Sequence, residues 1–210
     1  MMTDSETIGI MADSHGDADV IAAAILFFQK IGCRRMVHLG DICDSVACDQ
    51  ADTCVRILQK HAVLAVKGNN DHVVVKNRAW RQNGCISGET VAYLESLPLQ
   101  LEMSKALFVH SRPFADMLGL SAMTGDIEKD AAARFQVRYP GRVLFRGHGH
   151  SPRVTRLSDN RSASVDPVPG ESLQLDGQQG WIVTCGALYK GLCMTWTPGT
   201  GVVVSHRLAL

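Results

Sequence analysis

The feature that most constrains the fold of this chain is a repeated order of strand, loop and helix in its first third. The apolar runs TIGIM, RMVHLG and AVLAV are typical of buried strands, and residues 17–32 and 47–60 between them are typical of helices. Strands that alternate with helices pair in parallel, because each helix returns the chain to the same end of the sheet. The sequence therefore predicts an α/β fold built on a parallel sheet.

The middle of the chain continues with a predicted helix at 89–96. After it, LQLEM and ALFVHS are expected to pair as strands around a turn at Ser104 and Lys105. A loop is expected over 112–125, and a helix is expected to start after Gly125, over residues 126–140. The run RVLFRGHGH then predicts another strand, so the sheet system extends beyond the first three strands.

The final third changes to short apolar runs that indicate antiparallel strands. We expect the polar segment 158–170 to be a loop, and we place strands near residues 153–157, 172–176, 181–185, 192–197 and 201–207. The chain shows no internal repeat and no linker, and its 210 residues suffice for one core. We therefore expect residues 1–210 to form a single domain.

The composition excludes several classes of protein. Lys plus Arg and Asp plus Glu both total 21, so the formal net charge is zero and no overall field attracts nucleic acid or an anionic membrane. No run approaches the length of about 18 apolar residues that a membrane span needs, and the N-terminus lacks the pattern of a signal peptide. We expect a cytoplasmic protein without a nucleic-acid or membrane partner. The sequence gives no indication of oligomeric state.

The cysteine pattern favours free thiols. Seven cysteines occur without a C-x-x-C pair, unlike a disulfide framework or a zinc ribbon. Cys43 lies close to candidate metal ligands and could be a functional thiol, but small buried hydrophobic groups are the usual role of free cysteine. We therefore expect reduced, inert cysteines.

Polar side chains gather where the predicted strands end. The carboxyl ends of parallel strands open onto one crevice, which is where α/β folds bind ligands. Imidazole, carboxylate and amide groups at these ends would therefore converge. The residues are Asp13, His15, Asp41, Asp44, Asn69, Asn70, Asp71, His110, His148 and His150.

Two pairs within this set are spaced by two residues. In an extended chain, residues i and i+2 point to the same side, so Asp13 with His15, and His148 with His150, are expected to face one way. A glycine precedes each of the last two histidines. Glycine adds no side chain and permits unusual backbone angles, which would let these histidines crowd inward.

Each feature also has a simpler structural explanation. Asp13 could be the N-cap of the helix that follows it, and GDICD and GNND are compatible with ordinary turns. His110 alone would be a buried core histidine, which is what we expect of His38 inside its strand. Five strand ends that each supply a nitrogen or oxygen ligand are harder to explain by caps and turns. The complete set therefore favours a metal site.

The motifs MADSHGD, GDICD, GNND, VHS and GHGH, in this order, strongly resemble those of the calcineurin-like metallophosphoesterases over residues 8–150. The motifs of that superfamily run D-x-H, G-D-x-x-D, G-N-x-D/E, H and G-H-x-H. The resemblance is greatest to its small bacterial and archaeal phosphodiesterases. It implies a four-layer αββα sandwich of two mixed β-sheets flanked by helices, with the β-rich tail similar to the second sheet of that fold.

The resemblance also implies two metal ions that share Asp41. The ligands would be Asp13, His15, Asp41 and His150 for one ion, and Asp41, Asn69, His110 and His148 for the other. Imidazole and carboxylate ligands suit Mn, Fe, Ni or Zn rather than Mg or Ca, and we expect manganese. Two such ions about 3.5 to 4 Å apart would acidify a bridging water to hydroxide and neutralise charge on the oxygens of a phosphate.

The expected activity is hydrolysis of a small phosphate ester by the metal-bridging hydroxide, with a phosphodiester as the favoured substrate. Many relatives carry a histidine after the motif's asparagine as the general acid, but this chain has Asn70, which can hydrogen-bond a phosphoryl oxygen and cannot supply a proton. Asp44 would orient that histidine in phosphatases. Asn70 and Asp44 are the candidate catalytic residues. Asn70 and Arg112 are the candidate substrate contacts, although Arg112 could be an ordinary surface arginine.

Two alternative functions stay open. A nucleotide or dinucleoside-polyphosphate phosphatase would need an aromatic side chain for base stacking, and Phe114, Trp80 and Tyr93 are the candidates. The same fold could also serve as a non-catalytic binding scaffold, because fold alone does not determine function. A scaffold has no use for seven metal ligands, so the sequence favours an enzyme.

Overall fold

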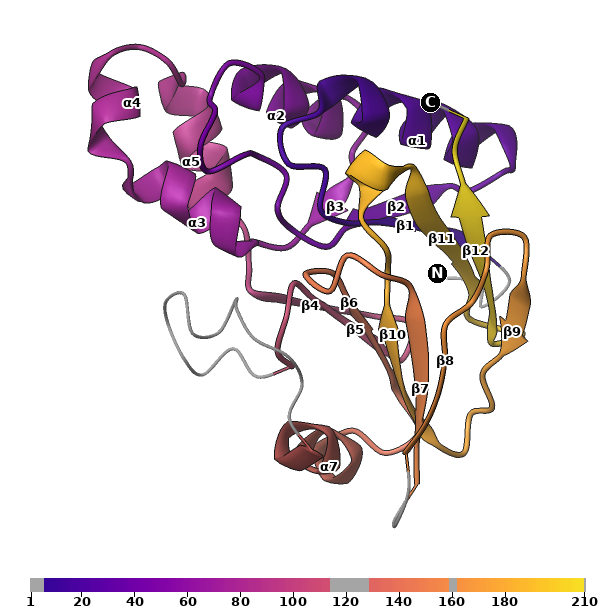
Figure 1. Ribbon diagram of the computed structural model, residues 1–210. Coiled ribbons are helices and arrows are strands. Elements are labelled where there is room, and N and C mark those ends of the chain that lie inside the picture. The colour runs from indigo at the N-terminus through magenta and orange to yellow at the C-terminus, as the bar shows by residue number, and fades with distance from the viewer. Residues whose placement is uncertain (1–5, 114–128, 159–161, 210) are drawn as a thin grey trace.

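The computed structural model of the protein describes residues 6–113, 129–158 and 162–209. Two six-stranded sheets face each other, with helices on the outer side of each (Figure 1). Each sheet contains parallel and antiparallel pairs. The predicted αββα sandwich of two mixed sheets flanked by helices is therefore confirmed.

The first sheet begins with the parallel strands that the sequence predicts. β1 pairs in parallel with β2, and β2 with β3. On its other side β1 pairs antiparallel with β11, so the C-terminal part of the chain completes this sheet. In spatial order the strands are β3 (Leu64–Ala65), β2 (Arg35–His38), β1 (Ile8–Met11), β11 (Leu192–Thr197), β12 (Val202–Arg207) and β9 (Ser172–Gln174).

The second sheet is built around three parallel strands, β5, β6 and β10. The β4–β5 hairpin turns at Ser104 and Lys105, whose positive φ angles of 51° and 64° suit the tight two-residue turn that the sequence predicts. In spatial order the strands are β4 (Gln100–Met103), β5 (Ala106–Val109), β6 (Val143–Arg146), β10 (Gly180–Thr184), β7 (Arg153–Leu157) and β8 (Ser162–Val165).

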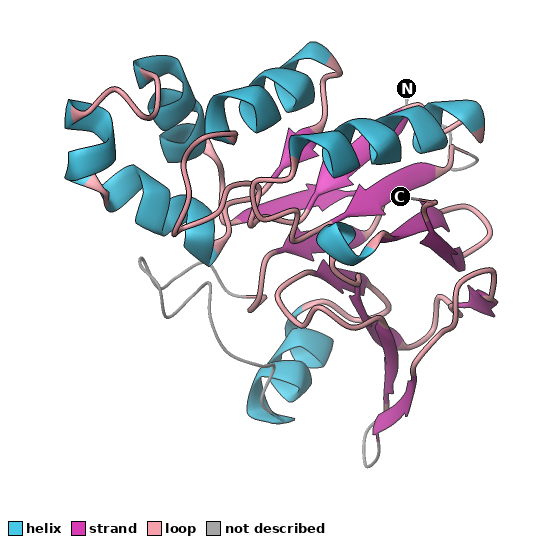
Figure 2. Ribbon diagram, turned by 45° about the horizontal axis from the view of Figure 1, so that its top comes forward, coloured by secondary structure: helices cyan, strands magenta, loops and turns pink. Residues whose placement is uncertain are grey.

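Helices cover the outer faces of both sheets, as Figures 1 and 2 show. The described helices are α1 (Ala18–Lys30), α2 (Ala51–Lys60), α3 (Asn69–Lys76), α4 (Arg78–Gln82), α5 (Gly88–Ser96), α7 (Lys129–Arg138) and the 3-10 helix η1 (Leu188–Lys190). Ile21, Ala24, Ile25 and Phe28 of α1 are buried at the spacing of one helix face. None of the helices within the described ranges combines the length and apolar character needed to span a membrane.

The N-cap of α1 shows whether Asp13 caps this helix, which the sequence left open. Asp17, and not Asp13, caps this helix, and its carboxylate accepts the N–H of Val20 at 3.0 Å. A side-chain acceptor at this position pairs one of the free N–H groups of the first turn. Asp13 is therefore available for another role.

The core between the sheets fixes how the two halves of the site approach each other. Phe108 and Phe145 stack with ring centres 5.3 Å apart, and Trp196 of the opposite sheet lies 5.0 Å from Phe145. Aromatic contacts of this kind contribute about 0.5–1.5 kcal/mol each beyond their buried area. A second apolar cluster lies between the first sheet and its helices, and a third, with Phe135 of α7, lies on the other sheet.

The C-terminal third differs from the prediction in two ways. Its strands pair antiparallel with one another, as predicted, but they do not make up the second sheet alone, because β9, β11 and β12 join the first sheet and β7, β8 and β10 join the second. The segment 158–170 is not a simple loop, since it contains β8, which pairs with β7. The residues of β8, SASV, are all exposed, so this strand buries no apolar face and reads as part of the polar segment around it.

The cysteines also depart from the expectation. Cys33, Cys43, Cys54, Cys185 and Cys193 are free and buried, as predicted. Cys48 and Cys85 instead form a disulfide that joins the segment before α2 to the turn before α5. The two residues are 37 positions apart, and their approach follows from the packing of the helices, which no local pattern records.

Candidate metal centre

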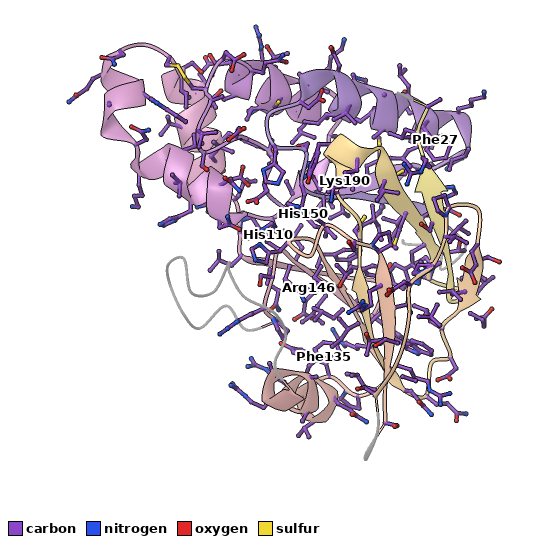
Figure 3. All side chains as sticks on the ribbon, in the orientation of Figure 1. Phe27, His110, Phe135, Arg146, His150 and Lys190 are labelled. Carbon is purple, nitrogen blue, oxygen red and sulfur yellow. A yellow bond between two sulfur atoms is a disulfide. The ribbon has the colours of Figure 1, made fainter. Side chains whose placement is uncertain are left out.

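The predicted ligands lie on loops that follow β1, β2, β5 and β6, and at the start of α3. Two groups of three side chains form, and within each group the ligand atoms lie within 4.8 Å of one another. Figure 3 shows one member of each group, His110 and His150, where the loops of the two sheets meet. The first group is Asp13, His15 and His150, and the second is Asp41, His110 and His148.

Five of these six residues have a left-handed backbone. Residues other than glycine rarely adopt it, and it gathers at functional sites where the surrounding structure enforces it. Hydrogen bonds between two loops enforce it here, from Asp13 N to Gly40 O and from His15 N to Asp41 O, both at 3.0 Å. The φ angles are 55° for Asp13, 49° for His15, 55° for Asp41, 63° for His148 and 55° for His150.

The expected extended backbone at the two spaced pairs is therefore wrong. A left-handed residue at each ligand makes the chain turn. Asp13 and His15 still reach the same group, as expected, whereas His148 and His150 go to different groups. The histidines, and not the glycines before them, take the unusual angles. Gly147 is needed for space instead, because a side-chain carbon there would lie 3.0 Å from the Cβ of Ala12 and 3.1 Å from Oδ2 of Asp13.

The first group has the spacing of ligands around one ion. The Nε2 atoms of His15 and His150 are 3.2 Å apart, and Nε2 of His150 is 3.7 Å from Oδ1 of Asp13. Ligands on an ion with bonds of about 2.1 Å lie roughly 3.0 to 3.4 Å apart in octahedral or tetrahedral geometry. These side chains therefore fit a divalent metal with small adjustments.

In the second group, the unprotonated ring nitrogen of His110 points toward oxygen atoms. Nδ1 of His110 lies 2.8 Å from the carbonyl oxygen of Leu39, which can only accept, so Nδ1 carries the proton. Burial lowers the pKa of His110 and keeps the ring neutral, which leaves a lone pair on Nε2. This lone pair faces Oδ1 of Asn69 at 2.9 Å and Oδ1 of Asp41 at 3.5 Å. Such a set of acceptors is suited to a cation.

Asp41 lies between the two groups. Its Oδ1 is 3.5 Å from Nε2 of His110, and its Oδ2 is 3.9 Å from Nε2 of His15. Asn70 donates its backbone N–H to Oδ1 at 2.8 Å and its side-chain amide to Oδ2 at 2.6 Å. The carboxylate thus offers one oxygen to each group, and Asn70 fixes its orientation.

The electrostatics of the site also favour bound cations. Burial and the neighbouring Asp41 raise the pKa of Asp13 well above its ordinary value, although its carboxylate accepts the N–H of His148. Burial and the neighbouring His15 lower the pKa of His150. Buried carboxylates beside neutral imidazoles carry a cost of desolvation that positive charge offsets.

Asp71 is expected to converge with the other polar residues, but the sequence assigns it no role; the structure makes it a supporting member of the site. Its buried carboxylate accepts the backbone N–H groups of Asp41 at 3.0 Å, Ile42 at 2.9 Å, Cys43 at 3.0 Å and Gly68 at 2.9 Å. It therefore fixes the loop that carries Asp41. The available signal was the acidic residue at the third position of α3, where carboxylates commonly reach back to the start of a helix.

His38 is a core histidine, as predicted. Its Nδ1 accepts the N–H of Gly40 at 3.2 Å, and its Nε2 lies 3.0 Å from the hydroxyl of Ser14. Burial lowers its pKa to about 3, so the ring stays neutral. His38 thereby links the two loops that carry the aspartates of the site.

The remaining predicted residues are not members of the two ligand groups. Asp44 is half-buried, and its Oδ1 accepts the N–H of Val46 at 2.8 Å in a local turn. Arg112 follows His110 by two residues and is half-buried, unlike a fully exposed surface arginine. Cys43 is buried, and burial raises its thiol pKa well above the ordinary value, which is the state of an inert cysteine.

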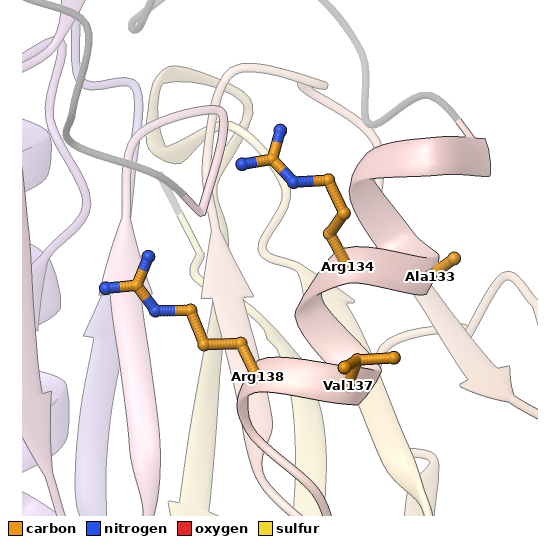
Figure 4. A pocket seen from close by; sticks show the side chains of 4 residues that line it. All are labelled: Ala133, Arg134, Val137 and Arg138. Atoms are coloured by element: carbon orange, nitrogen blue, oxygen red, sulfur yellow. The ribbon is translucent and has the colours of Figure 1, made fainter.

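Two of the three aromatic candidates for base stacking lie against an apolar cluster. Trp80 and Tyr93 pack against the apolar cluster between the first sheet and its helices. Phe114 lies outside the described residues. A hollow beside α7 is lined by Ala133, Arg134, Val137 and Arg138, all from that helix, and none of these is a predicted site residue (Figure 4).

The family follows from comparison with known proteins. The model of the calcineurin-like phosphoesterase superfamily domain matches residues 7–184. The chain therefore belongs to this superfamily and is a metal-dependent phosphoric ester hydrolase. The superfamily uses a dinuclear metal centre, and the two ligand groups are the candidate sites in this chain. No curated protein matches the sequence.

Solved structures of similar fold include a metallophosphoesterase from Sphaerobacter thermophilus, at 23% identity and a TM-score of 0.76 over 98% of this chain and 89% of the other. A putative diadenosine tetraphosphatase has 15% identity and a TM-score of 0.59 over 100% and 96% of the two chains. An archaeal phosphodiesterase has 14% identity and a TM-score of 0.52 over 96% and 99%. At these identities the likeness concerns the fold.

Proposed function

We propose that the protein is a dinuclear-metal phosphodiesterase that hydrolyses a small phosphate ester. The two ligand groups with Asp41 between them are the observation that carries this proposal, because one oxygen of the Asp41 carboxylate lies toward each group. The metal ligands are Asp13, His15, Asp41 and His150 for one ion and Asp41, Asn69, His110 and His148 for the other. These ligands come from loops of both sheets, which supports a single domain over residues 1–210.

The ligands set the chemistry of the centre. Manganese is our choice, with Fe, Ni or Zn as the other metals that suit imidazole with carboxylate. Two divalent ions, when bound, would lower the pKa of a water molecule and neutralise negative charge on the phosphate. Asp41 would hold one oxygen toward each ion, and the buried loops would keep both groups in place during turnover.

A diester is the preferred substrate because the motifs are most similar to those of the small phosphodiesterases. Asn70 bears on the leaving group, since an amide cannot protonate a departing alkoxide and therefore favours esters with a good leaving group or a proton supplied by water. Asn70 donates to Asp41, so we assign it the role of orienting this carboxylate, besides any contact with a phosphoryl oxygen. The similar archaeal phosphodiesterase supports this choice only through its fold. We propose Arg112 as a substrate contact and give Asp44 no catalytic step.

Hydrolysis assays on metal-stripped protein test the proposal. The protein is titrated with Mn, Ni, Zn or Mg, and release of nitrophenolate is measured from bis-p-nitrophenyl phosphate and from p-nitrophenyl phosphate. We expect metal-dependent cleavage that favours the diester, with a loss of at least about 100-fold in the Asp41→Asn variant. Cleavage of the monoester at a rate equal to or above that of the diester would reject the diesterase assignment. Absence of turnover with any metal would favour a binding scaffold.

A further inference from the structure

Tyr189 contacts the proposed metal site from outside the part of the chain that defines the family. It belongs to η1, beyond the stretch 7–184 that matches the superfamily. Its hydroxyl oxygen lies 3.3 Å from Nδ1 of His150, and 40% of the residue is exposed. The spacing of the sequence motifs gave no reason to connect it with His150.

The hydrogen bond to His150 has a defined direction if the imidazole is to bind a metal. Nε2 of His150 faces Nε2 of His15 and Oδ1 of Asp13, so Nε2 is the atom placed to bind the ion. A neutral ring with a free Nε2 carries its proton on Nδ1. The proton on Nδ1 then points to Tyr189, whose hydroxyl oxygen accepts it. A metal-binding histidine normally donates its other N–H in this way.

The ring of Tyr189 also limits how the two histidines can turn. Its centre lies 5.4 Å from that of His15 and 5.5 Å from that of His150, both in edge-to-face geometry. The two histidine rings are themselves 5.1 Å apart in the same geometry. Each of the three rings thus contacts the other two. The tyrosine ring therefore fills space beside both imidazoles and restricts their rotation on that side.

The backbone of η1 holds Tyr189 in register with the first ligand loop. Leu188 donates its N–H to the carbonyl of Ala12 at 2.7 Å, and Tyr189 donates its N–H to the carbonyl of Asp13 at 3.3 Å. On the outer side, Nζ of Lys190 lies 5.4 Å from the centre of the tyrosine ring. The position of the hydroxyl is therefore set by the same loop that carries Asp13 and His15.

We propose that Tyr189 is a positioning residue that keeps His150 in the tautomer whose Nε2 binds metal, and thereby sets the affinity of the first ion. This inference rests on the proposed dinuclear function. It assigns no contact with substrate to Tyr189. Since the second group contains neither His15 nor His150, Tyr189 acts on one ion and leaves the other unaffected.

The Tyr189→Phe variant isolates the hydroxyl because it keeps the aromatic ring. Tyr139→Phe is the matched control, since Tyr139 lies beside Phe135 of the cluster under α7, with ring centres 5.6 Å apart. Manganese affinity is measured on metal-stripped proteins by competition with a fluorescent chelator. We expect one of the two affinities to fall by about tenfold or more in Tyr189→Phe, with the other unchanged. Tyr139→Phe should bind both ions as the wild type does.

Two further measurements separate positioning from folding. The midpoint of thermal unfolding of metal-free Tyr189→Phe should match that of the metal-free wild type. The visible absorption of the cobalt-loaded variant should differ from that of the cobalt-loaded wild type in intensity or position. If Tyr189→Phe binds two ions with wild-type affinities, the positioning role is overturned and the dinuclear function is retained. If the wild type itself binds fewer than two ions, both proposals are overturned.

Discussion

The carboxylate of Asp71 accepts the backbone N–H of Asp41 at 3.0 Å, so a buried acid in α3 holds the loop of the proposed bridging ligand. Asp71 lies in the first turn of α3 and Asp41 in the loop after β2, so this hydrogen bond joins two segments that are 30 positions apart. This contact ties the stability of the fold to the geometry of the metal centre.

Replacing Asp71 should therefore destabilise the protein and weaken the site together. In Asp71→Asn, an NH2 group replaces one of the two carboxylate oxygens that accept backbone N–H groups, so donors face donors. We therefore expect a loss of about 3 kcal/mol in the free energy of unfolding. Urea denaturation of metal-free protein measures this. Asp176→Asn is the control, because Asp176 accepts two backbone N–H groups at an exposed turn and should lose less than about 1 kcal/mol. Equal losses in both variants would contradict the role of Asp71.

Gly68 should not accept a side chain. A side-chain carbon at this position would overlap the backbone nitrogen and the carboxylate of Asp41. We expect Gly68→Ala to cost about 1–3 kcal/mol of stability and to abolish tight binding of two ions. Gly88→Ala, where no atom lies within 4 Å of the added carbon, should unfold as the wild type does. Wild-type metal binding by Gly68→Ala would show that the close contact between Gly68 and Asp41 is not required for the site.

Reduction of the disulfide between Cys48 and Cys85 should lower stability. It closes a loop of 37 residues, for which chain entropy predicts an effect of up to about 4 kcal/mol. Denaturation with and without a reductant measures the loss. The double variant Cys48→Ser/Cys85→Ser should resemble the reduced wild type and should not respond to reductant. A response in the double variant would point to other thiols.

Asp52 should contribute stability that depends on pH. Partial burial opposes its ionisation, but hydrogen bonds from Thr90 and Ser87 outweigh this and lower its pKa below the ordinary value. Because the folded pKa is lowered, the contribution is complete above the unfolded pKa of about 3.9 and is lost as the pH falls through the folded value.

The difference in unfolding free energy between wild type and Asp52→Asn tests this sign. It should be largest near neutral pH and should shrink as the pH falls below about 4. Denaturant titrations at a series of pH values provide the comparison. A difference that stays constant across this range would mean that ionisation of Asp52 does not contribute.

Much of the fold follows from patterns that are local in sequence. The apolar run of β1 and the capped amphipathic helix behind it predict the parallel part of the first sheet. The convergence of Asp13, Asp41 and His110 follows from where their strands end. These predictions succeed because strand order in an α/β unit determines which loops meet.

Other features depend on contacts between distant segments. The left-handed backbone at His148 is maintained by the surrounding loops, and its amide reaches the carboxylate of Asp13 from 135 residues away. Tyr189 reaches His150 only because η1 bonds to the loop after β1. No local pattern encodes such contacts. The sequence therefore predicts which residues come together, but it does not predict the backbone conformations and hydrogen bonds that keep them in place.

A pair of metal ions shared through Asp41 can be observed directly in the anomalous difference density of a crystal grown with manganese, recorded near the manganese absorption edge. We expect two peaks per chain, about 3.5 to 4 Å apart, one on either side of the Asp41 carboxylate. A single peak, or a pair of peaks that Asp41 does not bridge, would contradict the proposed sharing of Asp41.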